Sequence, residues 1–152
     1  MNNPESELKP DGVYVLRSTI ITALFVTIVN IGYSQFYYEF TEFSSLDIIG
    51  MHYIATASLL SVSLAGMLFL ILINYSSKYK LIYISGVVGI TIFSILMPLS
   101  PDLPDGQPTP LGFFELTAPM HLFTGVSAAL FIPNWYNPRR FFFRFRKIKK
   151  NK

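Results

Sequence analysis

Four long apolar stretches constrain this chain more than any other feature of its sequence. They cover residues 13–33, 48–74, 81–99 and 116–136. A helix needs about 20 apolar residues to cross the hydrocarbon layer of a membrane. The stretches occupy more than half of the 152 residues, so too little chain remains for a separate soluble domain. The sequence therefore predicts an all-α membrane protein, a four-transmembrane-helix up-down bundle that forms a single domain over residues 1–152.

The basic residues predict how these helices are oriented. Two of the twelve Lys and Arg residues lie at the front of the chain, Lys78 and Lys80 separate the second and third stretches, and eight follow the fourth. The loops 34–47 and 100–115 contain no Lys or Arg and six acidic residues. Loops enriched in Lys and Arg remain cytoplasmic. We therefore expect a multi-pass protein of the cytoplasmic (plasma) membrane, with both termini cytoplasmic and both acidic loops outside.

Proline residues predict the outer loop before the fourth helix and the start of that helix. The segment 100–110 is too rich in Pro and Gly for regular structure, so we expect an ordered or semi-rigid loop. Pro119 is expected in the first turn of the fourth helix, where its missing N–H would be unpaired anyway.

The only two histidines, His52 and His121, fall one to two turns inside the outer ends of their predicted helices. The helix face around each carries mostly small residues, and small residues line helix–helix contacts in membranes. We expect both imidazoles to point into the bundle, where Asn30 would join them. Because ionisable groups inside a membrane indicate function, His52, His121, Asn30 and the nearby Asp102 form a predicted ligand or proton site.

Several interpretations of this site stay open at this point. Two neutral imidazoles on facing helices could ligate a haem iron, or could hold a divalent metal together with Asp102 or Glu115. They could also transfer protons or hydrogen-bond a quinone or another small ligand. The structural alternative is that each histidine bonds a carbonyl, a hydroxyl or water and fixes helix packing. Because no third strong ligand lies nearby, we predict no metal site and no resident cofactor.

The sequence lacks the patterns of familiar catalytic centres. It contains no Cys, which excludes disulfides, thiolate metal sites and Cys nucleophiles. No serine lies in an elbow with a partnered His and acid, and Gly86 and Gly89 lie within a predicted helix rather than in a phosphate-binding loop. We therefore predict no catalytic residues, and the sequence favours a protein that is not an enzyme.

The C-terminal tail, residues 139–152, is basic and rich in Phe. Its basic residues are Arg139, Arg140, Arg144, Arg146, Lys147, Lys149, Lys150 and Lys152. Basic clusters directly cytoplasmic of a span attract anionic lipids, and Phe side chains can insert at the headgroup boundary. We predict contacts with anionic lipids at the cytoplasmic face and no binding of nucleic acid, because the tail begins within a few residues of a span.

The two halves of the chain resemble each other at an offset of 69 residues. Residues 51–58 align with 120–127, and Thr22 aligns with Thr91. This pattern predicts a two-fold parallel repeat about an axis along the membrane normal. Chance similarity between apolar segments is the alternative.

The chain from the second stretch onward, about residues 48–135, has a further pattern: a span ending in proline, a Pro/Asp outer loop, and a His that opens the next span. The residues that carry it are Pro98, Pro101, Asp102, Pro104 and His121. The pattern resembles an uncharacterised family of small multi-span prokaryotic membrane proteins, a domain of unknown function. Members of that family commonly have more spans, and their Pro-x-Asp step appears here as Pro-Asp. The resemblance implies a multi-span architecture and no specific activity.

The sequence as a whole predicts a structural, accessory or assembly-forming component of the membrane, as a homo-oligomer or within a larger membrane complex. The main alternative is a redox or small-ligand protein that uses His52 and His121 to bind haem, quinone or metal. A second alternative is an oligomeric channel or carrier, which the lack of charge deep inside any predicted span disfavours.

Overall fold

The computed structural model describes residues 12–41, 50–102, 106 and 108–135. Within these residues the chain forms helices α1 (Gly12–Phe40), α2 (Met51–Tyr75), α3 (Tyr79–Leu96), η2 (Met97–Leu99) and α4 (Phe113–Trp135). Four of them, with η2 continuing α3, are long and apolar enough to cross a membrane. The prediction of an all-α chain with four such helices is confirmed. The orientation and the internal repeat stay predictions.

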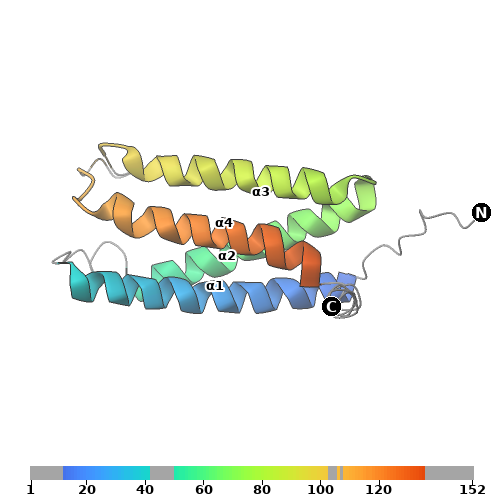
Figure 1. Ribbon diagram of the computed structural model, residues 1–152, viewed down its shortest axis with the longest axis horizontal. Helices are drawn as coiled ribbons and strands as arrows, with labels where there is room; N and C mark the ends of the chain where they lie inside the picture. Colours follow the sequence, from blue (N-terminus) through green and yellow to red (C-terminus); the bar gives the residue numbers. More distant parts are fainter. Residues whose placement is uncertain (1–11, 42–49, 103–105, 107, 136–152) are drawn as a thin grey trace, which may run out of the picture.

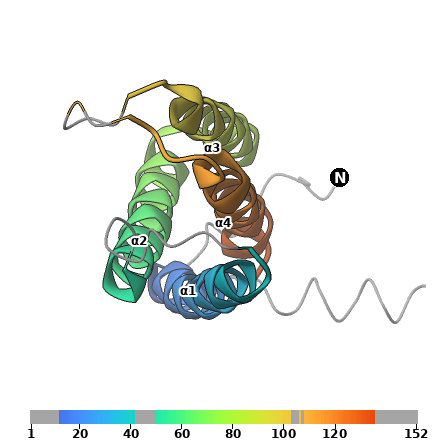
Figure 2. The same ribbon diagram turned by 90° about the vertical axis from the view of Figure 1, so that its left-hand side faces the viewer.

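Successive helices of the bundle run in opposite directions (Figure 1). Seen along the bundle, the helices form a ring in the order α1, α2, α3 and α4, with α1 and α3 at opposite corners (Figure 2). Each helix packs on both of its neighbours in the ring, and α4 also packs on α2 across the middle. Figure 1 shows that α2 is inclined to the other helices, so its buried face moves around the helix along its length.

The described charged residues divide between the two ends of the bundle. The basic residues lie where α1 begins and where α2 turns into α3, and they are Arg17, Lys78 and Lys80. The acidic residues lie at the opposite end, and they are Glu39, Asp102 and Glu115. The described part of the chain therefore has one basic and one acidic end, and the helices between these ends present an apolar surface.

The first helix is longer than predicted, because α1 continues beyond residue 33 to Phe40. Its last turns carry aromatic residues that bind the start of α4. The Tyr33 hydroxyl donates to the carbonyl oxygen of Glu115 at 2.8 Å, and the Tyr37 hydroxyl donates to that of Gly112 at 3.0 Å. These two bonds hold the acidic ends of α1 and α4 together.

The prediction that Pro119 lies in the first turn of α4 is wrong, because α4 begins at Phe113 and Pro119 lies inside it. A proline inside a helix removes the N–H that would bond the carbonyl four residues earlier, which here belongs to Glu115. The Tyr33 hydroxyl supplies a donor to this carbonyl. A side chain of α1 thus compensates for the proline and lets α4 begin earlier.

Two pairs of helices approach each other closely at glycine residues. A Cβ atom on Gly66 of α2 would collide with the Thr19 side chain of α1, and a Cβ atom on Gly125 of α4 would collide with Thr91 of α3. Small residues let membrane helices approach in this way. The α1–α2 and α3–α4 contacts therefore depend on the absence of a side chain at one position each.

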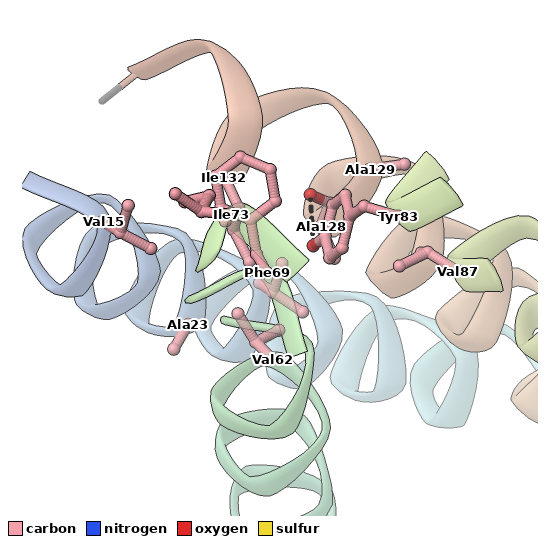
Figure 3. Packing of buried hydrophobic residues seen from close by; sticks show 11 residues of the cluster. Val15, Ala23, Val62, Phe69, Ile73, Tyr83, Val87, Ala128, Ala129 and Ile132 are labelled. Atoms are coloured by element: carbon pink, nitrogen blue, oxygen red, sulfur yellow. Dashed lines mark hydrogen bonds between the residues drawn. The ribbon is translucent and has the colours of Figure 1, made fainter. Parts of the chain in front are cut away.

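The two largest fully buried side chains, Tyr83 and Phe69, lie in the half of the bundle nearer the basic end. Tyr83 is fully buried there, and its hydroxyl donates to the carbonyl oxygen of Ala128 at 3.1 Å. The ring of Phe69 meets that of Tyr83 edge-on at 4.8 Å between centroids (Figure 3). Aromatic pairs in this geometry add about 0.5–1.5 kcal/mol beyond the area they bury. These contacts fill the bundle around Tyr83 and Phe69.

Candidate ligand site

The side chain of Asn30 joins three helices at one depth in the bundle. It lies on α1 and is 3% exposed. Its Nδ2 donates to Oγ of Ser58 on α2 at 2.9 Å and to Oγ1 of Thr124 on α4 at 3.0 Å. Because a buried amide is tolerated only when it is hydrogen-bonded, these two bonds explain how Asn30 can lie inside an apolar bundle.

The Thr124 hydroxyl fixes the orientation of the Asn30 amide. It donates its proton to the carbonyl oxygen of Met120 at 2.7 Å, so its oxygen can only accept a bond from Asn30. The amide group that faces Thr124 must therefore be the NH₂. Among the residues that the structure describes, Oδ1 of Asn30 is left without a hydrogen-bond partner. An unsatisfied buried acceptor costs about 1–3 kcal/mol, which a bound molecule or water would offset.

A cavity of about 180 Å³ lies beside Asn30, between α1, α2 and α4. We call it the polar cavity, because its lining includes the hydrogen-bonding side chains of Asn30, Ser58, Ser61, Thr117, His121 and Thr124. Among the described residues, no Asp, Glu, Lys or Arg lines it. The described lining therefore offers hydrogen-bond donors and acceptors but no carboxylate, ammonium or guanidinium group.

A second cavity, of about 350 Å³, lies between α2, α3 and α4. We call it the apolar cavity, because most of its lining is hydrophobic or small: Leu64, Ala65, Leu68, Val87, Ile90, Gly125 and Ala128. It shares Ser61, His121 and Thr124 with the polar cavity. The two cavities therefore meet at these residues.

His121 lies where the two cavities meet. Among the described residues its imidazole has no hydrogen-bond partner, and its side chain is exposed although it lines both cavities. A neutral imidazole carries one donor and one acceptor nitrogen. His121 can therefore both donate a hydrogen bond to a molecule in the cavity and accept one from it.

The expectation that His52 also points into the bundle is wrong. Its side chain is exposed, lines neither cavity, and lies against the ring of Tyr53 at 4.0 Å between centroids. The buried face of α2 runs through Ile54 and Ser58 at its outer end and reaches Gly66 further along the helix. A helical wheel drawn for a straight helix places His52 on the same face as Gly66. Because α2 is inclined, its buried face at the outer end runs through Ile54 and Ser58 and does not include His52.

Asp102 is exposed in the outer loop and lines neither cavity. It pairs with Pro108 in an isolated β-bridge. Thr109 closes the same loop, because its N–H donates to the carbonyl oxygen of Pro101 at 2.9 Å and its hydroxyl to that of Ser100 at 2.7 Å. Of the four predicted site residues, the structure brings Asn30 and His121 together and leaves His52 and Asp102 apart from them.

The structure separates the two histidines that were considered as metal or haem ligands. Within residues 12–41, 50–102, 106 and 108–135, no three or more His, Cys, Asp and Glu residues are grouped so that they could hold a metal ion. His52 and His121 do not share a cavity, so they do not form a facing pair of axial ligands. The predicted lipid-binding tail, residues 139–152, lies outside the described residues.

Sequence reasoning missed three hydrogen-bonding residues of the polar cavity: Ser58, Ser61 and Thr117. Ser61 lines both cavities, and Thr117 lines the polar one. The spacing of Thr117, His121 and Thr124 at four and three residues places them on one face of α4, and this regularity could have identified Thr117. Ser61 carried no comparable signal, because α2 contains several serines on different faces.

Comparison with known proteins does not assign the chain to a family. No protein-family model, curated protein or solved structure matches it. The resemblance to small multi-span prokaryotic membrane proteins stays a prediction. Any function therefore has to be inferred from the residues of the site.

Proposed function

We propose that the protein is an accessory component of the cytoplasmic membrane that binds a small uncharged molecule in the polar cavity. One observation carries this proposal. Two polar groups on different helices, Oδ1 of Asn30 and the imidazole of His121, lack a partner among the described residues and line the same cavity. Unsatisfied polar groups are costly at membrane depth, and polar residues inside spans often mark binding sites.

The geometry supports binding over catalysis. Nucleophilic catalysis needs a nucleophile within hydrogen-bond reach of a base that a third group orients. Within the described residues His121 bonds neither a hydroxyl nor a carboxylate, and the lining of the polar cavity contains no acid. Binding requires only the unpaired donors and acceptors that are present. An accessory, non-catalytic role is therefore the simplest account of this site.

The proposal includes an orientation. The basic end would face the cytoplasm, with both termini on that side, because Lys and Arg are enriched in cytoplasmic segments. The polar cavity would then lie in the outer half of the membrane. The basic tail, residues 139–152, would contact anionic lipids at the cytoplasmic surface.

The two histidines provide a matched test of the binding role. The full-length protein and its His121→Leu and His52→Leu variants would be purified in a mild detergent, and their organic extracts compared by mass spectrometry. The wild type and His52→Leu are expected to carry the same uncharged small molecule, and His121→Leu to carry about 5- to 150-fold less, since a ligand group left without its hydrogen bond costs about 1–3 kcal/mol. The absence of such a molecule from the wild type, or its equal retention in His121→Leu, would contradict the proposal.

A further inference from the structure

We infer that the ligand is a single-chain amphiphile with an uncharged, hydrogen-bond-donating head, bound with its head beside Asn30 and its chain in the apolar cavity. This inference rests on the proposed function and adds the chemical class of the ligand. The two cavities together have the form that such a molecule requires: a polar end and an apolar end that meet at Ser61, His121 and Thr124.

The head must donate a hydrogen bond, because the unpartnered Oδ1 of Asn30 can only accept one. The hydroxyl oxygen of Ser58 accepts from Asn30, and its own proton has no acceptor among the described residues. Ser58 can therefore donate to an oxygen of the ligand. A hydroxyl head satisfies both residues, since one hydroxyl donates one bond and accepts others. A ketone, an ether or an oxidised quinone only accepts, and would leave Oδ1 unpaired.

The head must also be uncharged. In the part of the chain that the structure describes, neither cavity is lined by Asp, Glu, Lys or Arg. A charged group moved into a membrane interior without a counter-charge costs several kcal/mol. A phosphate, carboxylate or ammonium head would have no such partner in this lining, so hydroxyl heads of the phenol or alcohol type fit best.

The apolar cavity has the length and lining for a hydrocarbon chain. It extends along α4 from His121 to Ala128, which at 1.5 Å per residue is about 10 Å. Beyond the junction with the polar cavity, two hydroxyls face it and make no demand on the ligand, because Thr91 donates to the carbonyl oxygen of Val87 at 2.7 Å and Ser94 to that of Thr91 at 2.9 Å. A chain that extends from the junction at Ser61, His121 and Thr124 would therefore meet apolar groups and the satisfied hydroxyls of Thr91 and Ser94.

The apolar cavity lies where α2 and α3 meet the surroundings of the bundle. Leu64 of α2 and Ile90 of α3 both line it, and both are well exposed, at 57% and 63%. A molecule dissolved in the lipid can therefore reach the apolar cavity from the side. Lateral access suits an amphiphile that already partitions into the membrane.

The head is tested with two probes of equal chain length. Binding of 4-decylphenol and of its methyl ether, 4-decylanisole, would be measured on the full-length protein in lipid nanodiscs, with empty nanodiscs to correct for partition. The phenol is expected to bind at least about tenfold more tightly, because the ether leaves Oδ1 of Asn30 unpaired. The Asn30→Leu variant should remove this difference. Where that variant does not fold, Ser58→Ala should weaken phenol binding instead, because it removes one donor to the head.

The position of the chain is tested with a pair of matched substitutions. Leu64→Trp adds volume at the apolar cavity, whereas Leu60→Trp makes the same change at an exposed residue of α2 that lines neither cavity. Leu64→Trp is expected to weaken 4-decylphenol binding about tenfold. Leu60→Trp should leave the affinity unchanged, and 4-methylphenol, which has no long chain, should bind all three proteins alike.

The outcomes separate this inference from the proposed function. Equal affinities for the phenol and its ether, or equal effects of Leu64→Trp and Leu60→Trp, would overturn the ligand class. So would a co-purified molecule that depends on His121 but has no hydroxyl head or no apolar chain, although the proposed binding role would then stand. If no probe binds above empty nanodiscs and no molecule that depends on His121 is extracted, both proposals fail.

Discussion

At the scale of single residues, the amide of Asn30 has two roles that can be measured separately. Its Nδ2 ties α1 to Ser58 and Thr124, while its Oδ1 is available to the proposed ligand. The first role concerns stability and needs no ligand. Interhelical hydrogen bonds in membranes contribute less than their burial suggests, about 0.6 kcal/mol on average, because the unfolded helices also find partners in the membrane.

A double-mutant cycle of Asn30→Ala and Ser58→Ala should give a coupling free energy of about 0.5–1.5 kcal/mol. The measurement is the free energy of unfolding in mixed micelles. Asn74 provides the control, because its Nδ2 bonds only the carbonyl oxygen of Leu70 in its own helix, at 3.1 Å. Asn74→Ala should change stability by less than about 0.5 kcal/mol. A coupling near zero would mean that the Asn30–Ser58 bond does not hold α1 and α2 together.

The candidate site was predictable only in part. Small residues beside His121 identified its face of α4, and the structure brings Asn30 to the same cavity. His52 was misplaced, because a helical wheel assumes that the buried face stays straight, whereas α2 is inclined and its buried face turns. The unpaired Oδ1 of Asn30 depends on the proton of Thr124, and no sequence pattern reports where that proton lies.

At the scale of whole elements, the bond between Tyr33 and the carbonyl of Glu115 links α1 to α4. Pro119 makes this carbonyl available, since a proline cannot donate to it. The predicted end of α1 and the predicted start of α4 differ from the structure for a physical reason. Hydropathy reports where the membrane ends, but α1 and α4 extend further because their aromatic and carbonyl groups satisfy each other beyond that limit.

Tyr33→Phe should destabilise the protein by about 1 kcal/mol, measured as the free energy of unfolding. In a Pro119→Ala background the same substitution should have less than half this effect, because the N–H of residue 119 can then bond Glu115. Tyr14→Phe is the control, since Tyr14 is exposed and has no hydrogen bond among the described residues. An equal loss in both backgrounds would show that Pro119 does not create the need for Tyr33.

The packing of α3 on α4 depends on the close approach of Thr91 to Gly125. Gly125→Leu should therefore destabilise the bundle by about 1–3 kcal/mol or more, seen as a lower midpoint of thermal unfolding in detergent. Gly89→Leu is the matched control, because nothing lies within 4 Å of a Cβ at that position of α3. It should be neutral or slightly stabilising, as glycine is a poor helix former. Similar losses for both variants would contradict this account of the α3–α4 contact.

At the scale of the whole molecule, the charged residues lie at the two ends of the bundle and an apolar surface lies between these ends, an arrangement typical of helices that span a membrane. The described basic residues lie at one end and the described acidic residues at the other, and four helices long and apolar enough to span a membrane connect the ends. This level of organisation was the most predictable from sequence, because it depends on the order of charged and apolar segments and not on the direction of any side chain. Which end faces the cytoplasm stays a prediction, and so does the internal repeat.

The absence of Cys from the sequence makes the orientation directly measurable. Ser77 and Ser100 are exposed serines in turns at the basic and acidic ends, so single Cys substitutions there form a matched pair. In intact cells, a membrane-impermeant maleimide should label Ser100→Cys, and should label Ser77→Cys only after the membrane is permeabilised. Labelling of Ser77→Cys alone in intact cells would reverse the orientation, and equal labelling of both would contradict a bundle that spans the membrane.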